Sequence, residues 1–466
     1  MYMLGKSSLP ESVRNAMENK MILVVGEEVI LWKQNRTTLH NYGIKIILVE
    51  SKPISFPPED VHRYIQYNFT DHRHDDLHAE RIIAKLSADN ILVDGCCTFT
   101  DEHGPLTAYL CQKLGLNGAG VTGAINARIK SLTHIYLQKQ VGGVHQFPRT
   151  NRYTARCAPI VGEASLRSAI RAIGLPAICK PENYENANGV MLIKNIAEYP
   201  RLIQSLRNLL ENRNPLMMME YFDGTEHDIE VILYQGEVLA AIVSDNGPTR
   251  PESFLETSMS MPSCLPTSKA AQLRRAASDC CIDIGLMNGV FNVEMKITPA
   301  GPKLLEINGR MGGDYIRDWV YTCFGFDLMW YVMAISAGMR PPIPNQKPNA
   351  HVMGITCSWP VHQHIICNKD FGIKVGELVK SNDIIFFGEK CIDVKENHSK
   401  EPFDICNVAV IKQDLESAKT ALLNVCDLLG IHNEQFDVPA CLSHFVTDAP
   451  SEVDDLLYNS FSSSSL

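Results

Sequence analysis

FNVEMKITPAGPKLLEINGRMGG, residues 291–313, contains two apolar strands on either side of a Pro299–Pro302 turn. Glu294 lies on the first strand, and Glu306 and Asn308 lie on the second. Side chains two positions apart share one face of a strand, so Glu306 and Asn308 point the same way, and Glu294 can lie opposite them. Two carboxylates and an amide form an all-oxygen ligand set that suits Mg²⁺.

The surroundings of the two glutamates favour a metal site over an ordinary solvated hairpin. Apolar residues flank Glu294 and Glu306, and a carboxylate in an apolar strand is costly unless a charge or a metal satisfies it. Arg310 follows as a cation, and Gly312 and Gly313 allow the backbone to approach a ligand closely. Because Mg²⁺ takes few protein carboxylates, we interpret the hairpin as a site for nucleotide-bound metal.

Further segments precede the hairpin in order. Lys130 opens a predicted helix, Lys180 ends a predicted strand, and LMMMEYFDGTE occupies residues 216–226. Together with Glu-x-Asn-x-Arg-x-Gly-Gly at 306–313, these segments resemble the nucleotide- and metal-binding signatures of ATP-grasp ligases. The resemblance spans residues 130–313.

The resemblance implies how this chain would hold ATP. Lys130 and Lys180 would contact the phosphates as point charges. Glu220 and the backbone near Phe222 would address adenine. Glu226, in Gly-x-Glu, would hold the ribose hydroxyls.

The resemblance also implies the metals and the chemistry. Glu294 and Glu306 would hold one Mg²⁺, and Glu306 with Asn308 a second, with Mn²⁺ as a substitute. The γ-phosphate would pass to a substrate carboxylate, and an amine would attack the acyl phosphate to give an amide. We expect Arg310 to stabilise the oxyanion or phosphate of that intermediate. The alternative for Arg310 is a structural salt bridge within the hairpin.

The residues after the arginine resemble one branch of the family, the L-amino-acid ligases (dipeptide synthetase and carnosine synthase-like). These residues are Gly312-Gly313-Asp314-Tyr315-Ile316. Glu256, within a segment that resembles Glu-x-x-His-x-x-Pro, points to the same branch. The resemblance implies that an amino-acid substrate is bound by Glu256, Arg310, Gly312 and Gly313.

Two positions depart from the pattern of this branch. Met259 stands where the branch has His, and a thioether cannot donate a hydrogen bond as an imidazole does. The predicted phosphate loop, residues 186–190, carries Asn-Ala in place of the usual Gly-Ser pair. From these departures we expect either a substrate that differs from the common dipeptide case or slow catalysis.

The region before the grasp segments alternates strand and helix signals. Apolar runs at Met21–Gly26, Ile44–Glu50 and Ile91–Asp94 predict a parallel, doubly wound sheet. The sequence therefore predicts an α/β fold, α+β in the grasp lobes, with a Rossmann-like N-terminal domain and a C-terminal mixed β domain. The expected domains are 1–120 (N-terminal), 121–340 (ATP-grasp; small lobe about 121–220, large lobe about 221–340) and 341–458 (C-terminal), followed by a disordered tail, 459–466.

The composition of the chain limits the classes of partner that we expect it to bind. Lys and Arg total 43 against 53 Asp and Glu, a net charge of −10 without a long basic run, so neither nucleic acid nor a membrane is expected as a partner. The 15 cysteines include no Cys-x-x-Cys, and residues 1–20 do not form a secretory signal, which favours the cytoplasm. Leu328–Met339 is too short to span a bilayer and predicts a core helix, and Leu415–Leu429 predicts another helix.

Three features are interpreted as structural. Asp71–His78, rich in His and Asp, is read as a solvated loop entering a helix rather than as a metal cluster. Trp319 and Trp330 are expected in the core. Cys179, beside Lys180, is expected to be a small buried hydrophobe rather than a nucleophile.

The sequence predicts an ATP- and Mg²⁺-dependent carboxylate–amine ligase that joins an amino acid to another amino acid or amine. The alternatives are an ATP-grasp carboxylase or purine-pathway ligase, and a non-catalytic ATP-binding regulatory module. Neither substrate is identified. The oligomeric state stays open, with a homodimer as the commonest soluble assembly.

Overall fold

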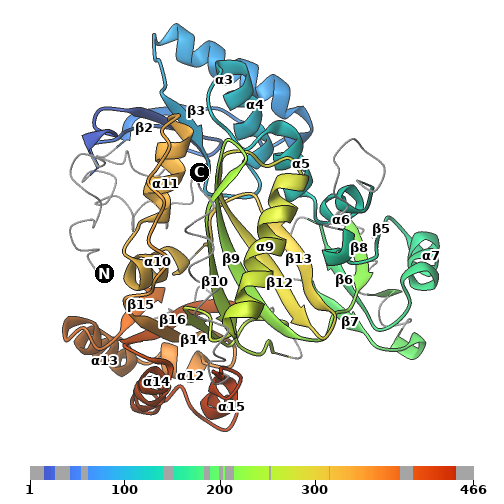
Figure 1. Cartoon of the computed structure of the whole chain (residues 1–466), viewed down its shortest axis with the longest axis vertical. Helices are drawn as coiled ribbons and strands as arrows, with labels where there is room; N and C mark the ends of the chain where they lie inside the picture. Colours follow the sequence, from blue (N-terminus) through green and yellow to red (C-terminus); the bar gives the residue numbers. More distant parts are fainter. Residues whose placement is uncertain are drawn as a thin grey trace.

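Three β-sheets with helices packed around them make up the computed structural model (Figure 1). The described residues are 15–26, 42–53, 61–139, 151–182, 189–198, 203–204, 215–250, 253–313, 315–388 and 402–447. The predicted tail, 459–466, and residues 186–188 of the predicted phosphate loop lie outside them.

A four-stranded parallel sheet of order β3-β2-β1-β4 lies in the N-terminal region, as predicted. Both faces of its central strands are buried. Leu23 and Ile47 pack in a cluster with α3 and α4, whereas Ile22 and Ile46 pack in a cluster with α11 (Leu328–Ser336). The elements are β1 (Met21–Val25), β2 (Lys45–Glu50), β3 (Val61–Gln66), η1 (His72–His74), α3 (Asp75–Ala88), β4 (Gly95–Cys97) and α4 (Gly104–Leu114).

One predicted strand of this sheet was wrong. The strand is β4, Gly95–Cys97, and not the more apolar run Ile91–Asp94 before it. The Asp94 carboxylate accepts hydrogen bonds from the Met21 backbone N and from Lys20 Nζ, each at 2.8 Å, so it anchors the start of β1 from outside the sheet. Strand β3 was not predicted, because it is an edge strand whose side chains are mostly polar.

The second sheet has four antiparallel strands in the order β5-β8-β6-β7. Helix α7 packs on it and buries Leu166, Ala169 and Ile173. The elements before and within this sheet are α5 (Val121–Arg128), α6 (Lys130–Lys139), η3 (Asn151–Tyr153), β5 (Cys157–Ile160), α7 (Glu163–Ile173), β6 (Ala177–Pro181), β7 (Met191–Ile193), η4 (Ile196–Glu198) and β8 (Leu216–Glu220).

The third sheet has eight antiparallel strands in the order β13-β12-β9-β10-β11-β14-β16-β15. Helix α9 packs on β9, β10, β12 and β13, and α14 packs on β14 and β16 (Figure 1). The elements are β9 (Thr225–Tyr234), β10 (Glu237–Asn246), β11 (Ser258–Met261), α9 (Thr267–Asp283), β12 (Gly289–Thr298), β13 (Gly301–Asn308), α10 (Ile316–Phe324), α11 (Leu328–Ser336), β14 (His351–Trp359), α12 (Gln363–Ile366), α13 (Lys369–Lys380), β15 (Ile385–Gly388), β16 (Phe403–Lys412), α14 (Leu415–Leu429) and α15 (Val438–Leu442).

The large sheet runs across the predicted domain boundary at 340/341. Strands β14, β15 and β16 extend the same hydrogen-bonded sheet that contains β9 to β13, because β14 pairs with β11. The predicted C-terminal region thus adds strands to the large lobe. The division of the chain into domains remains a prediction.

Helices α10 and α11 fill the space between the parallel sheet and the large sheet. Trp319, Trp330 and Tyr331 are fully buried there, in one apolar cluster with residues of β1, β2 and β10. The predicted core helix at Leu328–Met339 is α11, whose nine residues are all buried. Within the described residues, no helix has both the length and the apolar composition needed to cross a membrane.

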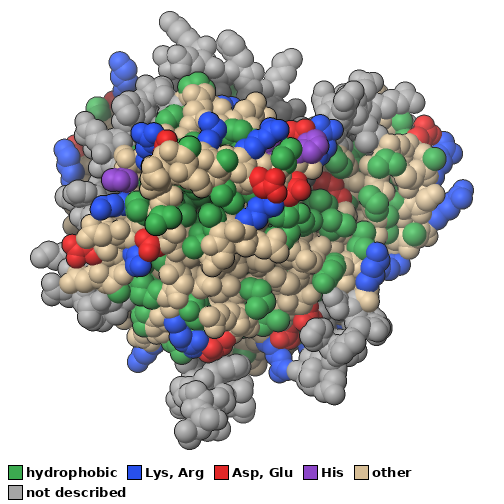
Figure 2. All heavy atoms as spheres, turned by 90° about the horizontal axis from the view of Figure 1, so that it is seen from above, with side chains coloured by type: hydrophobic (Ala, Val, Ile, Leu, Met, Phe, Trp, Pro, Cys, Tyr) green, Lys and Arg blue, Asp and Glu red, His purple; other side chains and the backbone are tan. Residues whose placement is uncertain are grey.

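The face drawn in Figure 2 mixes charges of both signs. Among the residues described there, basic and acidic side chains alternate with apolar ones, without a broad patch of one sign.

Candidate active site

The hairpin of β12 and β13 places the predicted metal ligands on one face of the large sheet. Glu294 pairs with Glu306 across the hairpin, and a β-bulge follows Glu294. On its other side, β12 pairs with β9, so Glu294 also lies opposite Asp228. Three carboxylates therefore form a row across β13, β12 and β9.

Two lysines from the smaller lobe face the first carboxylate of the row. Lys180 Nζ donates to Glu306 Oε2 at 2.9 Å, and Lys130 Nζ lies 3.6 Å from Glu306 Oε1. Burial disfavours the charged form of Glu306, but the two ammonium groups outweigh burial and lower its pKa to about 2. Burial likewise opposes the charge of Lys180, but Glu306 prevails and raises the pKa of Lys180.

A second contact explains why the two lysines meet. The Glu182 carboxylate, just after β6, accepts a hydrogen bond of 2.9 Å from the Ser131 backbone N at the start of α6. Glu182 is buried, so this bond fixes the first turn of α6 beside the end of β6. Lys130 and Lys180 are held together by this bond.

Glu294 lacks such compensation. Burial, together with the neighbouring Glu306 and Asp228 carboxylates, raises the pKa of Glu294 well above its usual range. The Asn308 amide nitrogen donates to Glu294 Oε1 at 3.0 Å and to Asn292 Oδ1 at 2.8 Å, which leaves its amide oxygen as the atom suited to a cation. The donor set is all oxygen, carries excess negative charge and fits Mg²⁺ or Mn²⁺.

The sequence analysis missed two buried carboxylates on β9. Burial raises the pKa of Asp228 to about 7, and Glu226 and Glu230 add to the shift. Glu230 accepts from Asn292 Nδ2 at 2.8 Å and from the Gly312 backbone N at 2.9 Å. The alternation Glu-His-Asp-Ile-Glu at 226–230 was the available signal, because it places every second residue on one face of a strand.

The residues expected to bind adenine and ribose lie where β8 ends and β9 begins. Glu220 is the last residue of β8, and its carboxylate pairs with Arg156 at 3.3 Å. Lys303 Nζ lies 5.5 Å from the centre of the Phe222 ring. Glu226 is 3.7 Å from Lys296 Nζ.

The segment expected to bind the substrate contains Glu256 and Met259 and lies beside the same carboxylates. Glu256 accepts a hydrogen bond of 2.6 Å from Asn246 Nδ2, and that nitrogen also contacts Asp228. Burial, and after it Asp228 and Glu226, raises the pKa of Glu256 well above its usual range. Met259 is 2% exposed and, like Glu256, lines the cavity that is described below.

Arg310 and the glycine pair follow β13. Arg310 Nε lies 3.0 Å from Asp101 Oδ2, a carboxylate in the loop after β4, so the salt bridge leaves the hairpin rather than staying within it. A Cβ on Gly312 would lie 2.4 Å from Glu230 Oε1, whereas one on Gly313 would lie 3.9 Å from its nearest neighbour, Arg310 Nη1. The Glu230 carboxylate and the Ile316 side chain therefore occupy the space that a side chain at position 312 would need.

The two lysines and the three carboxylates of the row line one cavity of about 400 Å³. Every predicted site residue lines it, as do Asp101 from the loop after β4 and Tyr315 from the start of α10. Phe387 and residues 404–407 supply a wall from β15 and β16. The sequence analysis missed that wall, because strand order in the C-terminal region could not be predicted.

Comparisons with known proteins agree with this geometry. The sequence model of a family described as "ATP-grasp in the biosynthetic pathway with Ter operon" matches residues 212–358, which include the hairpin. In this part of its sequence the chain is similar to the ATP-grasp superfamily. The predicted ATP-grasp fold and the resemblance to its amino-acid ligase branch are confirmed.

Two curated relatives match longer parts of this chain. Carnosine synthase 1 of Homo sapiens is 33% identical over 455 residues, which cover 95% of this chain and 54% of that protein. Alanine–anticapsin ligase of Bacillus subtilis is 26% identical over 283 residues, 55% of this chain and 57% of that protein. The chain thus spans about half the length of the curated relatives it matches.

The fold itself is shared with an L-amino acid ligase from Bacillus licheniformis. That crystal structure superposes with a TM-score of 0.66 and 16% sequence identity, covering 88% of this chain and 98% of that chain. At this identity the likeness concerns the fold.

Proposed function

We propose that the protein is an ATP- and Mg²⁺-dependent carboxylate–amine ligase that joins an amino acid to another amino acid or amine. The observation that carries the proposal is the carboxylate row of β13, β12 and β9, which faces two lysines across one cavity. Cations on one side and metal-binding oxygens on the other suit a nucleoside triphosphate.

The row itself supports binding of divalent cations. Glu294 and Glu306 would hold one Mg²⁺, and Glu306 with Asn308 a second. Bound there, the ions would supply charge neutralisation for phosphoryl transfer. Asp228 adds a third carboxylate to the same face, and this further acidic group favours the binding of cations there.

The remaining residues would bind and orient the reactants. Lys130 and Lys180 would hold the phosphates of ATP as point charges, and Glu226 the ribose. A substrate carboxylate oxygen attacks the γ-phosphorus and ADP leaves. The amine nitrogen then attacks the acyl carbon, inorganic phosphate leaves, and the nitrogen loses a proton to give the amide. Arg310, which lines the cavity, would donate to the oxygens that gain charge.

The names of the relatives favour this reaction over the alternatives. Carnosine synthase and alanine–anticapsin ligase are named for joining their components, and both resemble this chain in sequence. A carboxylase or purine-pathway ligase, and a regulatory module that binds ATP without turnover, remain as alternatives. A cytoplasmic location and a homodimer also stay predictions.

A screen of ADP release tests the proposal. The protein is incubated with ATP, Mg²⁺ and each of the twenty amino acids, singly and in pairs, and the products are examined by mass spectrometry. We expect stimulation by particular pairs and a condensed product. Stimulation by bicarbonate alone would select the carboxylase, and ATP binding without turnover under every condition would select the regulatory module.

Glu306→Gln tests the metal assignment. The substitution removes the charge shared by the ligand set and both lysines, so we expect kcat to fall by more than about 100-fold, beyond the loss typical of an outer-sphere contact. Glu163→Gln, at an exposed helix start, is the matched control and should retain activity. Near-normal turnover in Glu306→Gln would refute the assignment.

A further inference from the structure

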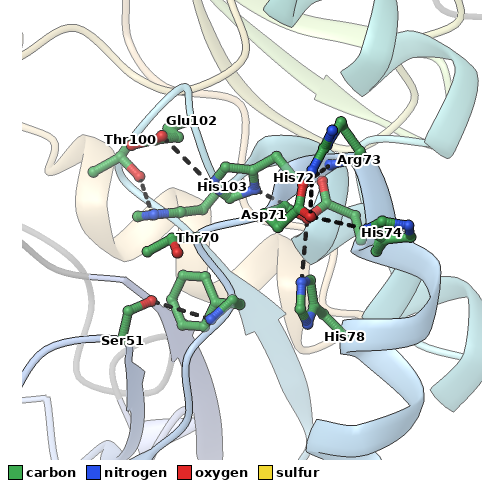
Figure 3. A network of polar contacts seen from close by, with 12 residues as sticks. Ser51, Thr70, Asp71, His72, Arg73, His74, His78, Thr100, Glu102 and His103 are labelled. Atoms are coloured by element: carbon green, nitrogen blue, oxygen red, sulfur yellow. Dashed lines mark hydrogen bonds and ion pairs between the residues drawn. The ribbon is translucent and has the colours of Figure 1, made fainter.

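A second cluster of ligating side chains lies in the N-terminal domain, beyond the carboxyl ends of β3 and β4. His72 comes from the segment after β3, and Glu102 and His103 come from the loop after β4 (Figure 3). One ligand atom from each of the three residues lies within 4.8 Å of the others, and His72 Nε2 is 3.5 Å from Glu102 Oε1. The sequence analysis considered only Asp71–His78 and could not foresee the approach of the second loop.

Each imidazole is oriented by a contact at its other nitrogen. His72 Nδ1 lies 3.0 Å from Asp75 Oδ1, and His103 Nδ1 lies 2.6 Å from Thr100 Oγ1. A carboxylate only accepts, so His72 carries its proton on Nδ1 and presents the Nε2 lone pair to the cluster. Contacts of this kind hold the histidine ligands of metal sites in their binding tautomer.

Packing also fixes the His103 ring. A Cβ on Gly26, at the end of β1, would lie 2.1 Å from that ring, so the ring occupies the space that glycine leaves. The Phe69 ring meets it edge-on with centroids 5.1 Å apart. His103 is therefore held in place before any ligand binds.

A further polar atom lacks a partner beside the cluster. Asp75 is 4% exposed, and its Oδ2 makes no hydrogen bond to any residue that the structure describes. A buried carboxylate with one unpaired oxygen is costly. Positive charge on the His72 imidazole, or on an ion bound to it, would reduce that cost.

We propose that His72, Glu102 and His103 form a binding site for a divalent transition-metal ion, with Zn²⁺ as the representative ion. Two imidazole nitrogens and one carboxylate oxygen suit Zn²⁺ and related ions, whereas Mg²⁺ prefers oxygen alone. Ligand atoms at about 2.0–2.1 Å from a tetrahedral ion lie about 3.3 Å apart, close to the observed separation of His72 and Glu102. Three protein ligands leave the fourth position for water.

The proposed site is separate from the carboxylate row and does not rest on the proposed function. The loop that carries Glu102 also carries Asp101, the partner of Arg310. The amino end of α4 adds positive potential near His103, which the carboxylates of Asp75 and Glu102 offset.

Metal analysis tests the site without measuring turnover. The full chain is stripped with a chelator, incubated with Zn²⁺ in the presence of excess Mg²⁺ and no nucleotide, and dialysed. We expect about one equivalent of retained Zn²⁺ and, with Co²⁺ instead, the visible absorption of a tetrahedral nitrogen-bearing site. Retention of no Zn²⁺ by the wild-type protein would overturn the proposal.

Variants locate the site. His72→Gln should lose the bound Zn²⁺ and the Co²⁺ absorption, and Asp75→Asn should weaken binding about 10- to 100-fold. His74→Gln is the matched control, because His74 is exposed in the same segment but contacts Asp71 instead. Glu102 is 56% exposed, so Glu102→Gln tests the carboxylate without disturbing the core. Unchanged binding in His72→Gln and Glu102→Gln would also overturn the proposal.

Discussion

Arg310 has a structural partner and a proposed chemical role at the same time. Its Nε pairs with Asp101 at 3.0 Å, while its guanidinium lines the cavity. A donor aimed at developing charge contributes to kcat, whereas a tether contributes to stability and orientation. The two roles separate when each partner is changed in turn.

We expect Arg310→Ala to lower kcat about 10²- to 10³-fold, the cost of removing one such donor. Asp101→Asn keeps the shape of the partner and should lower kcat much less. Steady-state kinetics of both variants on the substrate pair found in the screen provide the measurement. Equal losses in both variants would mean that Arg310 acts only as a tether.

The pKa of Asp228 predicts a pH dependence of stability. Burial raises this pKa from 3.8 to about 7, so the folded protein binds a proton that the unfolded chain releases between these values. The stabilisation from this proton is complete below about pH 3.8 and is lost as the pH rises through about 7. Without metal, stability from this group therefore falls between pH 6 and pH 8.

Asp228→Asn tests that contribution, together with the effect of the Asp228 charge on the neighbouring Glu256 and Glu294. Buried histidines such as His134, whose pKa burial lowers to about 4, titrate in both proteins and cancel in the difference. The melting temperature of the variant minus that of the wild type should increase from pH 6 to pH 8 in metal-free buffer. A difference independent of pH would show that Asp228 does not titrate in this range.

At the scale of elements, the junction of β13 with α10 depends on one glycine. Gly312→Ala would place a Cβ 2.4 Å from Glu230 Oε1 and 2.7 Å from Ile316 Cγ2. Overpacking of this kind costs about 1–3 kcal/mol of unfolding free energy. Gly313→Ala is the adjacent control, since its Cβ would meet no atom closer than 3.9 Å. Urea unfolding of both variants tests the prediction, and equal stabilities would contradict it.

Elements with a strong local pattern were predictable, and those without one were not. The hairpin around Pro299 and the helix Leu415–Leu429 follow from alternation and from periodicity with a capping Asp414. Strand β4 consists of three small residues, so the strand was predicted instead at the more apolar run before it. The pairing of β9 with β12 joins segments far apart in the sequence, which is why Asp228 was missed.

At the scale of the whole molecule, the cavity is lined by residues that are far apart in the sequence, from Asp101 to Asn407. The ATP-grasp motifs predicted the nucleotide side of the cavity, because the residues of each motif lie close together in the sequence. The opposite side, with Phe387 and Asn407, depends on β16 pairing with β14 in the large sheet. Such a wall is a consequence of tertiary pairing and has no local signature.

A buried ion pair between α10 and the residue before α11 also contacts the N-terminal region of the chain. Arg317 donates twice to Asp327, each time at 2.6 Å, and Tyr42, from the segment before β2, donates to Asp327 Oδ2 at 2.7 Å. Arg317 is 4% exposed and Asp327 is 1% exposed. The contact lies beside α11, which packs between the two sheets.

Asp327→Ala would leave the Arg317 charge buried without this partner and should destabilise the protein by about 3–5 kcal/mol. Tyr42→Phe removes only the bond from the N-terminal domain and should cost about 1.5–3 kcal/mol, as for other hydrogen bonds to charged groups. Glu237→Ala, which breaks an exposed pair with Arg340, is the control and should leave stability near that of the wild type. Urea unfolding followed by tryptophan fluorescence is the measurement, since Trp319 and Trp330 lie in the same core. If Tyr42→Phe left the unfolding midpoint unchanged, the bond from Tyr42 would not contribute to holding the N-terminal domain on the large lobe.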